Sequence, residues 1–76
     1  MTKRDFDYVT DHPILKKHYN LLWKLATESK VLCICSKEIG NEFYLEECCD
    51  EWYTHDLTKD ECLELSELFK EIAEII

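Results

Sequence analysis

Glycine and proline are nearly absent from the 76-residue sequence, which contains one of each. That composition leaves little room for a flexible linker or a disordered tail. No apolar run approaches the roughly 20 residues needed to cross a bilayer. The basic N-terminal stretch also lacks the apolar core of a signal peptide. We therefore predict a single domain over 1–76, located in the cytoplasm, or in the host cytoplasm if the protein is phage-encoded.

The sequence also lacks the common catalytic motifs. It has no glycine-rich phosphate loop and no metalloprotease or kinase motif. His55-Asp56 resembles part of a nucleophilic pair, but nothing in the sequence places a thiol beside it. His18 falls between Ile14 and Leu22 at helical spacing, which favours a place at the edge of the core over a ligand role. We expect no catalytic residues and no enzymatic activity.

Cysteine is plentiful but is not arranged as a recognised framework. The five cysteines are Cys33, Cys35, Cys48, Cys49 and Cys62. The number is odd and no Cys-x-x-Cys pair occurs, which argues against a disulfide scaffold and a zinc site. A Cys-x-Cys pair on a strand lies on one face with its side chains about 7 Å apart. We therefore expect buried reduced thiols, with no metal and no cofactor. The alternative is a zinc- or thiol-based regulatory module that uses Cys33, Cys35, Cys48 and His55.

Basic residues are scarce in the second half of the chain. Residues 1–37 carry seven Lys/Arg against four Asp/Glu, a net charge of +3, whereas residues 38–76 carry two against thirteen, a net charge of −11. Neutralising phosphates requires clustered cations. The second half is therefore not expected to bind nucleic acid directly.

Local patterns predict an α+β fold with the order α-β-β-β-α. Asp11 and Pro13 indicate the start of a helix over 11–28, and residues 1–10 could form an extended arm. Residues 31–35 and 42–46 favour two strands joined by a two-residue turn at Gly40-Asn41, which would pair Cys33 with Cys48, Ile34 with Glu47 and Leu32 with Cys49. Residues 52–57 favour a third strand.

The last helix has the clearest signals. Thr58 and Glu61 match a capping box, which predicts a helix from 58 to about 75. Its apolar stripe contains residues Cys62, Leu65, Phe69, Ile72 and Ile76. The predicted fold is a three-stranded antiparallel meander with two helices packed on one face. The other face, with Val31, Cys33, Cys35 and Tyr44, would then be open to a partner or a second copy.

Two acidic groups stand out. The first follows the last helix at spacings of four and three, on the face opposite the apolar stripe, and consists of Asp60, Glu64, Glu67, Glu71 and Glu74. Like charges at this spacing each cost roughly 0.2–0.5 kcal/mol. The second group is interleaved with aromatic residues. Its acids are Glu42, Glu46, Glu47, Asp50 and Glu51, and its aromatic members are Trp52 and Tyr53. Alternatively, the first group is a solvated face and the second protects a strand edge.

These features favour a non-enzymatic binding protein that uses its acidic half to engage a basic protein surface. It could act as an inhibitor or modulator of a nucleic-acid-binding protein. Small acidic proteins of mobile genetic elements often work in this way, which suggests a phage origin. A homodimeric structural protein is a further alternative. No membrane partner is expected.

Overall fold

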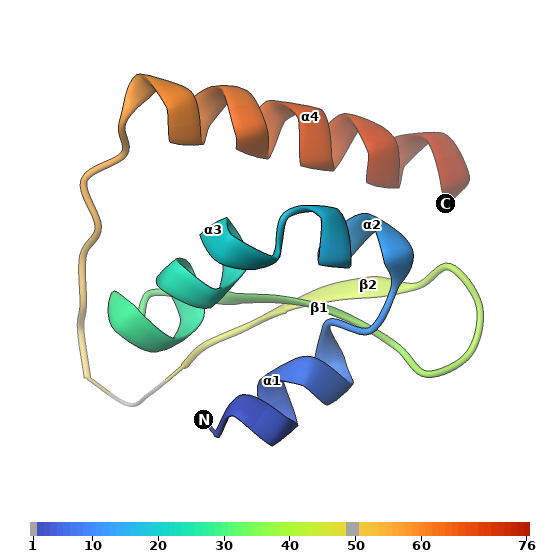
Figure 1. The fold of residues 1–76 in the computed structure, drawn as a ribbon, viewed down its shortest axis with the longest axis horizontal. Coiled ribbons are helices and arrows are strands. Elements are labelled where there is room, and N and C mark those ends of the chain that lie inside the picture. Colours follow the sequence, from blue (N-terminus) through green and yellow to red (C-terminus); the bar gives the residue numbers. More distant parts are fainter. Residues whose placement is uncertain (1, 49–50) are drawn as a thin grey trace.

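The computed structural model describes residues 2–48 and 51–76. It is an α+β fold with a two-stranded antiparallel sheet. The elements are α1 (Lys3–Val9), α2 (Pro13–Lys17), α3 (Tyr19–Trp23), the π-helix η1 (Lys24–Glu28), β1 (Cys33–Ser36), β2 (Phe43–Glu46) and α4 (Lys59–Ile75). α4 runs along the upper edge in Figure 1, and α2 contacts both α4 and β1. No helix in the described ranges has the length and apolar character needed to cross a bilayer.

The N-terminal segment is a helix, so the predicted extended arm over 1–10 is wrong. The Thr2 hydroxyl accepts a hydrogen bond from the Asp5 N–H at 3.2 Å and caps α1. Phe6 is fully buried and contacts the rings of Tyr19 and Trp23 edge-on, with centroids 5.2 Å away in each case. A seven-residue helix is too short to show a clear apolar period. Its stability therefore depends on the tertiary contacts of Phe6.

The predicted helix over 11–28 is divided into three parts. Its first part is capped by the His12 ring, whose Nδ1 accepts from the Ile14 N–H at 3.2 Å, rather than by Asp11. The helix breaks at His18, whose φ is −115° and ψ is 25°. It ends as a π-helix, in which the Ser29 N–H donates to the Lys24 carbonyl at 2.7 Å. Neither glycine nor proline marks the break, so the sequence carries no local signal for it.

The two predicted strands of the hairpin form, but their register differs from the prediction. Cys33 pairs with Glu46 and Ile34 with Leu45, two residues away from the predicted partners. The loop is longer than two residues, since it closes with a hydrogen bond from the Lys37 N–H to the Glu42 carbonyl at 2.9 Å. An even shift of register keeps each side chain on its predicted face. Cys49, the predicted partner of Leu32, lies outside the described residues.

The predicted third strand over 52–57 does not form. In the part of the chain that the structure describes, the sheet has two strands, and 52–57 is an extended connector to α4. Trp52 is 92% exposed, so its apolar surface does not hold the connector in a sheet. The connector is fixed instead by side-chain hydrogen bonds from His55 to Ser29 and Glu61.

The sheet faces are also covered differently from the prediction of two helices on one face. All four side chains of β1 are buried, and since neighbours on a strand point in opposite directions, both faces of β1 are covered. The face with Cys33 and Cys35, which we expected to be open, is therefore closed. On the opposite face of the sheet, the apolar side chain of Leu45 on β2 is 66% exposed.

α4 confirms the predicted last helix and its capping box. The Glu61 N–H donates to the Thr58 hydroxyl at 3.2 Å, and the Thr58 N–H donates to the Glu61 carboxylate at 2.9 Å. The buried face differs from the predicted stripe, because Leu68 is 0% exposed whereas Phe69 is 47% exposed. At about 100° per residue, the buried face is turned by roughly 80° towards the acidic row.

Candidate functional site

The turned helix brings part of the acidic row against the basic first half of the chain. His18, whose side chain is 6% exposed, places Nδ1 2.9 Å from Glu64 Oε2 and Nε2 3.6 Å from Glu71 Oε2. The Lys17 ammonium donates to Glu71 Oε1 at 2.7 Å. This hydrogen bond is the main reason why the pKa of Glu71 lies below its ordinary value. Glu64 and Glu71 therefore stabilise the packing of α4 on α2.

The spacing predicted that the acidic row forms a uniform face opposite the core. The structure shows that it does not. Asp60, Glu67 and Glu74 are exposed, whereas Glu64 and Glu71 are half-buried beside α2. Other acids are also paired with the first half, since Lys24 lies 3.3 Å from Glu61 and Lys37 lies 3.2 Å from Glu42. The opposite net charges of the two halves indicate such internal pairs as well as a basic partner outside the chain.

The second acidic group lies mostly on the surface. Glu46 and Glu47 are exposed at the end of β2, and Glu51 accepts a hydrogen bond from the Tyr53 hydroxyl at 2.9 Å. Asp50 lies outside the described residues. In Figure 1, α2 and α3 lie between β2 and the middle of α4, whereas Glu42, just before β2, lines a hollow together with Ile76 at the end of α4.

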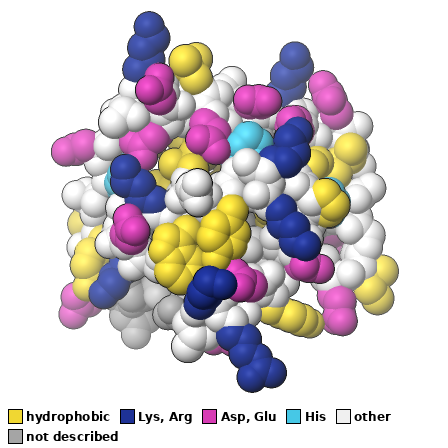
Figure 2. All heavy atoms as spheres, in the orientation of Figure 1, with side chains coloured by type: hydrophobic (Ala, Val, Ile, Leu, Met, Phe, Trp, Pro, Cys, Tyr) yellow, Lys and Arg dark blue, Asp and Glu magenta, His cyan; other side chains and the backbone are white. Residues whose placement is uncertain are grey.

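Charges of both signs surround a hydrophobic patch on the face of the molecule shown in Figure 2. The patch lies over α3, where the half-buried rings of Tyr19 and Trp23 stack with centroids 6.1 Å apart. The Tyr19 hydroxyl donates to Asp7 at 2.8 Å, and Lys3 lies 3.2 Å from the same carboxylate. Because its charges are mixed, this face does not have the acidic character expected of a site for a basic partner.

His55 attaches the connector both to Ser29, which follows η1, and to α4. Its Nδ1 lies 2.8 Å from the Ser29 hydroxyl and its Nε2 lies 3.0 Å from Glu61 Oε2. A hydroxyl, an imidazole and a carboxylate in this order also occur in serine hydrolases. Here Glu61 is also held by Lys24 and by the Thr58 N–H, so each group has a structural role in joining the connector to the start of α4.

These hydrogen bonds make the stability of the fold depend on pH through Glu61. The Thr58 N–H, followed by His55 and Lys24, lowers the pKa of Glu61 from 4.5 to about 2. The ionised carboxylate therefore stabilises the folded state above pH 4.5, and this stabilisation is lost as the pH falls from 4.5 towards 2. We expect the urea midpoint of Glu61→Gln to fall less steeply than that of the wild type across this range.

The control for this prediction is Glu67→Gln, which neutralises an exposed acid on the same helix. It should retain the wild-type dependence on pH. Equal slopes for wild type and Glu61→Gln would contradict the assigned role of Glu61.

The three cysteines among the candidates for a metal or thiol module lie near one another, but His55 does not join them. Cys33 and Cys35 are buried with their sulfur atoms 3.2 Å apart, closer than the 7 Å that strand spacing suggested, because their side chains converge. Cys48 is half-buried against the same core. His55 belongs instead to the network with Ser29 and Glu61. Among residues 2–48 and 51–76, no group of three or more His, Cys, Asp or Glu side chains is placed to hold a metal ion.

An apolar groove of about 190 Å³ lies between α4, the connector and β1. Leu65 and Phe69 contribute from α4, His55 and Leu57 from the connector, and Ile34 from β1. Leu45 is the cross-strand neighbour of Ile34 on the same face. The sequence did not reveal this groove, because it depends on the rotation of α4 and on the unpaired connector.

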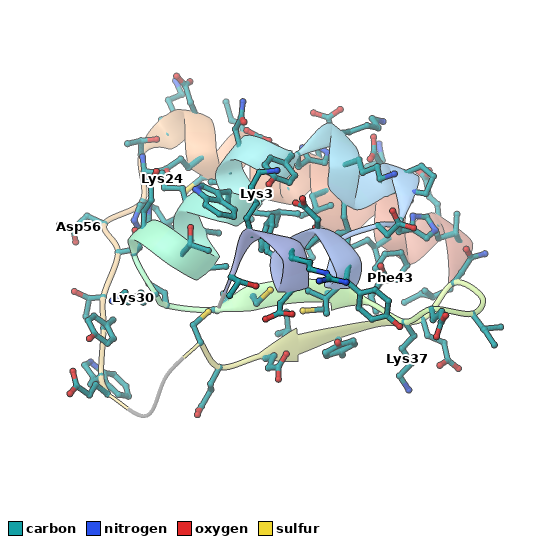
Figure 3. The ribbon with its side chains drawn as sticks, turned by 60° about the horizontal axis from the view of Figure 1, so that its bottom comes forward. Lys3, Lys24, Lys30, Lys37, Phe43 and Asp56 are labelled. Atoms are coloured by element: carbon teal, nitrogen blue, oxygen red, sulfur yellow. The ribbon has the colours of Figure 1, made fainter. Side chains whose placement is uncertain are left out.

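The side chain of Asp56 projects from the outer side of the connector in Figure 3. Its neighbours His55 and Leu57 both line the groove. Glu47, two residues after Leu45, is exposed as well. The groove therefore has an apolar lining, and Asp56 lies on the far side of the connector that forms one of its walls.

The comparisons with known proteins add no family to this description. No protein-family model matches the chain, and neither a curated protein nor a solved structure shows significant similarity to it.

Proposed function

We propose that the protein is an acidic binding protein that engages a basic protein surface through the groove between α4, the connector and β1. The observation that carries this proposal is the exposure of apolar side chains at the groove. Leu57 is 53% exposed and Phe69 is 47% exposed, and Leu45, the cross-strand partner of the groove residue Ile34, is 66% exposed. Large apolar residues exposed together commonly mark an interaction surface.

Charge favours a basic occupant. The chain carries a net charge of −8, Asp56 is exposed between the groove-lining residues His55 and Leu57, and Glu47 is exposed two residues after Leu45. An apolar side chain of the partner would fill the groove, while its Lys or Arg residues would meet these carboxylates. Charge complementarity of this kind raises the association rate and excludes acidic competitors. A nucleic-acid-binding protein has such a basic surface, and occupying it would compete with phosphate contacts.

The same charges argue against a second copy of this chain as the occupant. In a twofold symmetric dimer, the same patch faces itself. Glu47 and Asp56 would then face the equivalent carboxylates, and like charges at an interface oppose association. The homodimeric alternative would be supported by light scattering that shows a stable dimer at physiological salt.

The test compares charge reversal at the groove with charge reversal elsewhere. Immobilised wild-type protein is incubated with cell lysate at low and high salt, and captured proteins are quantified. We expect a salt-sensitive basic partner whose capture falls by about tenfold for the double variant Glu47→Lys/Asp56→Lys. Leu57→Ser, which leaves the net charge unchanged, should weaken capture of the same protein.

The matched control is Glu67→Lys/Glu74→Lys, which changes the net charge equally on the exposed side of α4. It should retain most of the binding. Equal losses for the two reversals would show an effect of net charge alone, and loss only for the α4 reversal would place the interface on α4. Either result would overturn the groove as the binding site.

A further inference from the structure

Two buried thiols lie in direct contact on β1. Cys33 and Cys35 are 1% and 0% exposed, and their sulfur atoms are 3.2 Å apart. Two thiolates on a tetrahedral zinc ion, with zinc–sulfur bonds of about 2.3 Å, lie about 3.8 Å apart. The sulfur atoms of Cys33 and Cys35 are closer than that, so no ion fits between them. The spacing points to chemistry between the sulfurs themselves.

The surroundings make the two thiols unequal. Cys35 shares hydrogen bonds with Cys33 and with the hydroxyl of Tyr44, its cross-strand partner, and these lower the pKa of the Cys35 thiol. The contact with Cys35, together with burial, raises the pKa of Cys33. A thiolate on Cys35 accepts from both the Cys33 thiol and the Tyr44 hydroxyl, which makes Cys35 the attacking sulfur and Cys33 the resolving sulfur.

We propose that Cys33 and Cys35 form a dithiol site that reduces hydroperoxides and is converted to an intrastrand disulfide. In the first step the Cys35 thiolate attacks one oxygen of hydrogen peroxide. The oxygen–oxygen bond breaks, a sulfenic acid forms on Cys35, and the hydroxide released takes up a proton to become water. The Cys33 sulfur then attacks the Cys35 sulfur, and the sulfur–oxygen bond breaks. The hydroxyl group leaves as water with the Cys33 proton, so two electrons pass from the dithiol to the peroxide.

The backbone spacing allows this bridge. A rise of about 3.3 Å per residue places the Cα atoms of Cys33 and Cys35 roughly 6.6 Å apart on a regular strand. Disulfides join Cα atoms that are usually about 4.4–6.8 Å apart, most often about 5.5–6 Å. The Cβ atoms of a disulfide lie about 3.5–4.5 Å apart, closer than neighbours on one face of a regular strand, so the bridge requires β1 to shorten and bend at Ile34. Disulfides under such constraint are easily reduced again by small thiols.

A small oxidant also suits the burial of the site. Buried cysteines are usually inert because reagents do not reach them. Tyr44 belongs to β2, a four-residue strand whose neighbouring residues Leu45 and Glu46 are exposed. Local opening of such a strand requires less free energy than global unfolding. Hydrogen peroxide is small enough to use that opening, whereas bulky alkylating reagents should react far more slowly.

The test uses the wild-type protein and peptide mapping. Reduced protein is treated with hydrogen peroxide, unfolded, alkylated and digested with trypsin. Cleavage after Lys30 and Lys37 gives a peptide over 31–37 that contains Cys33 and Cys35 but none of the other cysteines. We expect this peptide to lose two hydrogen atoms and to resist alkylation until a reductant is added. Oxygen added only to Cys48 or Cys62, or a disulfide joining 31–37 to another peptide, would overturn the proposal.

Variants then separate the two roles. Cys33→Ser should leave a sulfenic acid on Cys35 that a cyclic diketone traps once the protein is unfolded in its presence, whereas Cys35→Ser should slow peroxide consumption by about tenfold or more. The control is Cys62→Ser, which removes an exposed thiol on α4 and should leave the yield of the 31–37 disulfide unchanged. Circular dichroism confirms that each variant is folded. Sulfenic acid formation on Cys33 in preference to Cys35 would contradict the assignment.

Discussion

Leu68→Ala is expected to lower the free energy of unfolding by about 2–5 kcal/mol, the usual range for a leucine truncated in a closed core. Leu68 is fully buried and belongs to the central cluster with Phe6, Leu15 and Leu22. Its loss creates a cavity between α4 and the rest of the fold. A domain of this size has a thin core, so the change would remove a large part of the total stability. Urea unfolding followed by circular dichroism measures it.

The matched control is Phe69→Ala on the same turn of α4. Phe69 is half-exposed on the groove, so its truncation should cost about 1 kcal/mol or less. The sequence pattern predicts the opposite order, because its apolar stripe includes Phe69 and not Leu68. A larger loss for Phe69→Ala than for Leu68→Ala would show that α4 buries a different face.

His18→Ala is expected to lower the free energy of unfolding by about 1–3 kcal/mol. The substitution removes the imidazole between Glu64 and Glu71 and leaves both carboxylates without this partner at the edge of the core. It also removes the side chain that lies under α4 at the break between α2 and α3. Denaturant unfolding near neutral pH provides the measurement.

Lys16→Ala is the control for this prediction. Lys16 is exposed and lies 3.1 Å from Asp11, an ion pair on the surface. Such pairs contribute about 1 kcal/mol or less.

The cycle of His18→Ala, Glu64→Ala and the double variant isolates the contact between His18 and Glu64. Independent, additive effects in that cycle would show that this contact does not stabilise α4.

Local chemistry accounts for the parts of the fold that the sequence predicted. The capping box of Thr58 and Glu61 sets the start of α4 through two backbone hydrogen bonds within four residues. Gly40 has a positive φ of 79° in the hairpin loop, as a turn residue should. The alternation of the strands assigned Ile34 and Leu45 to one face correctly, although the pairing itself was wrong.

Contacts between distant residues decide the parts that the sequence did not predict. α1 depends on Phe6 packing against α3, and the break at His18 occurs where the ring meets acids 46 and 53 residues further along the chain. The connector resembles a strand in composition, but its extended conformation is held by side chains from η1 and α4. The hydrophobic periodicity of the sequence carries no information about such distant partners.

In the candidate site, too, the sequence predicted the local features, whereas contacts between distant residues decided the rest. Composition identified the acidic half of the chain, but pairing within the fold uses Glu61, Glu64 and Glu71. Strand alternation placed Cys33 and Cys35 on one face, but only the side-chain conformations bring their sulfur atoms into contact. Phe69 joins the groove because the helix is rotated, which the apolar spacing of α4 alone did not indicate.

Ile34 lies between Cys33 and Cys35 in the sequence and points to the opposite face, where it lines the groove. A bridge that shortens β1 would shift Ile34 and change the shape of the groove floor. Thermodynamic linkage then applies in both directions. If oxidation changes the affinity of a groove ligand by some factor, binding of that ligand changes the oxidation equilibrium of the dithiol by the same factor. A ligand that requires the unshifted Ile34 would thus protect the thiols from oxidation without touching either sulfur atom.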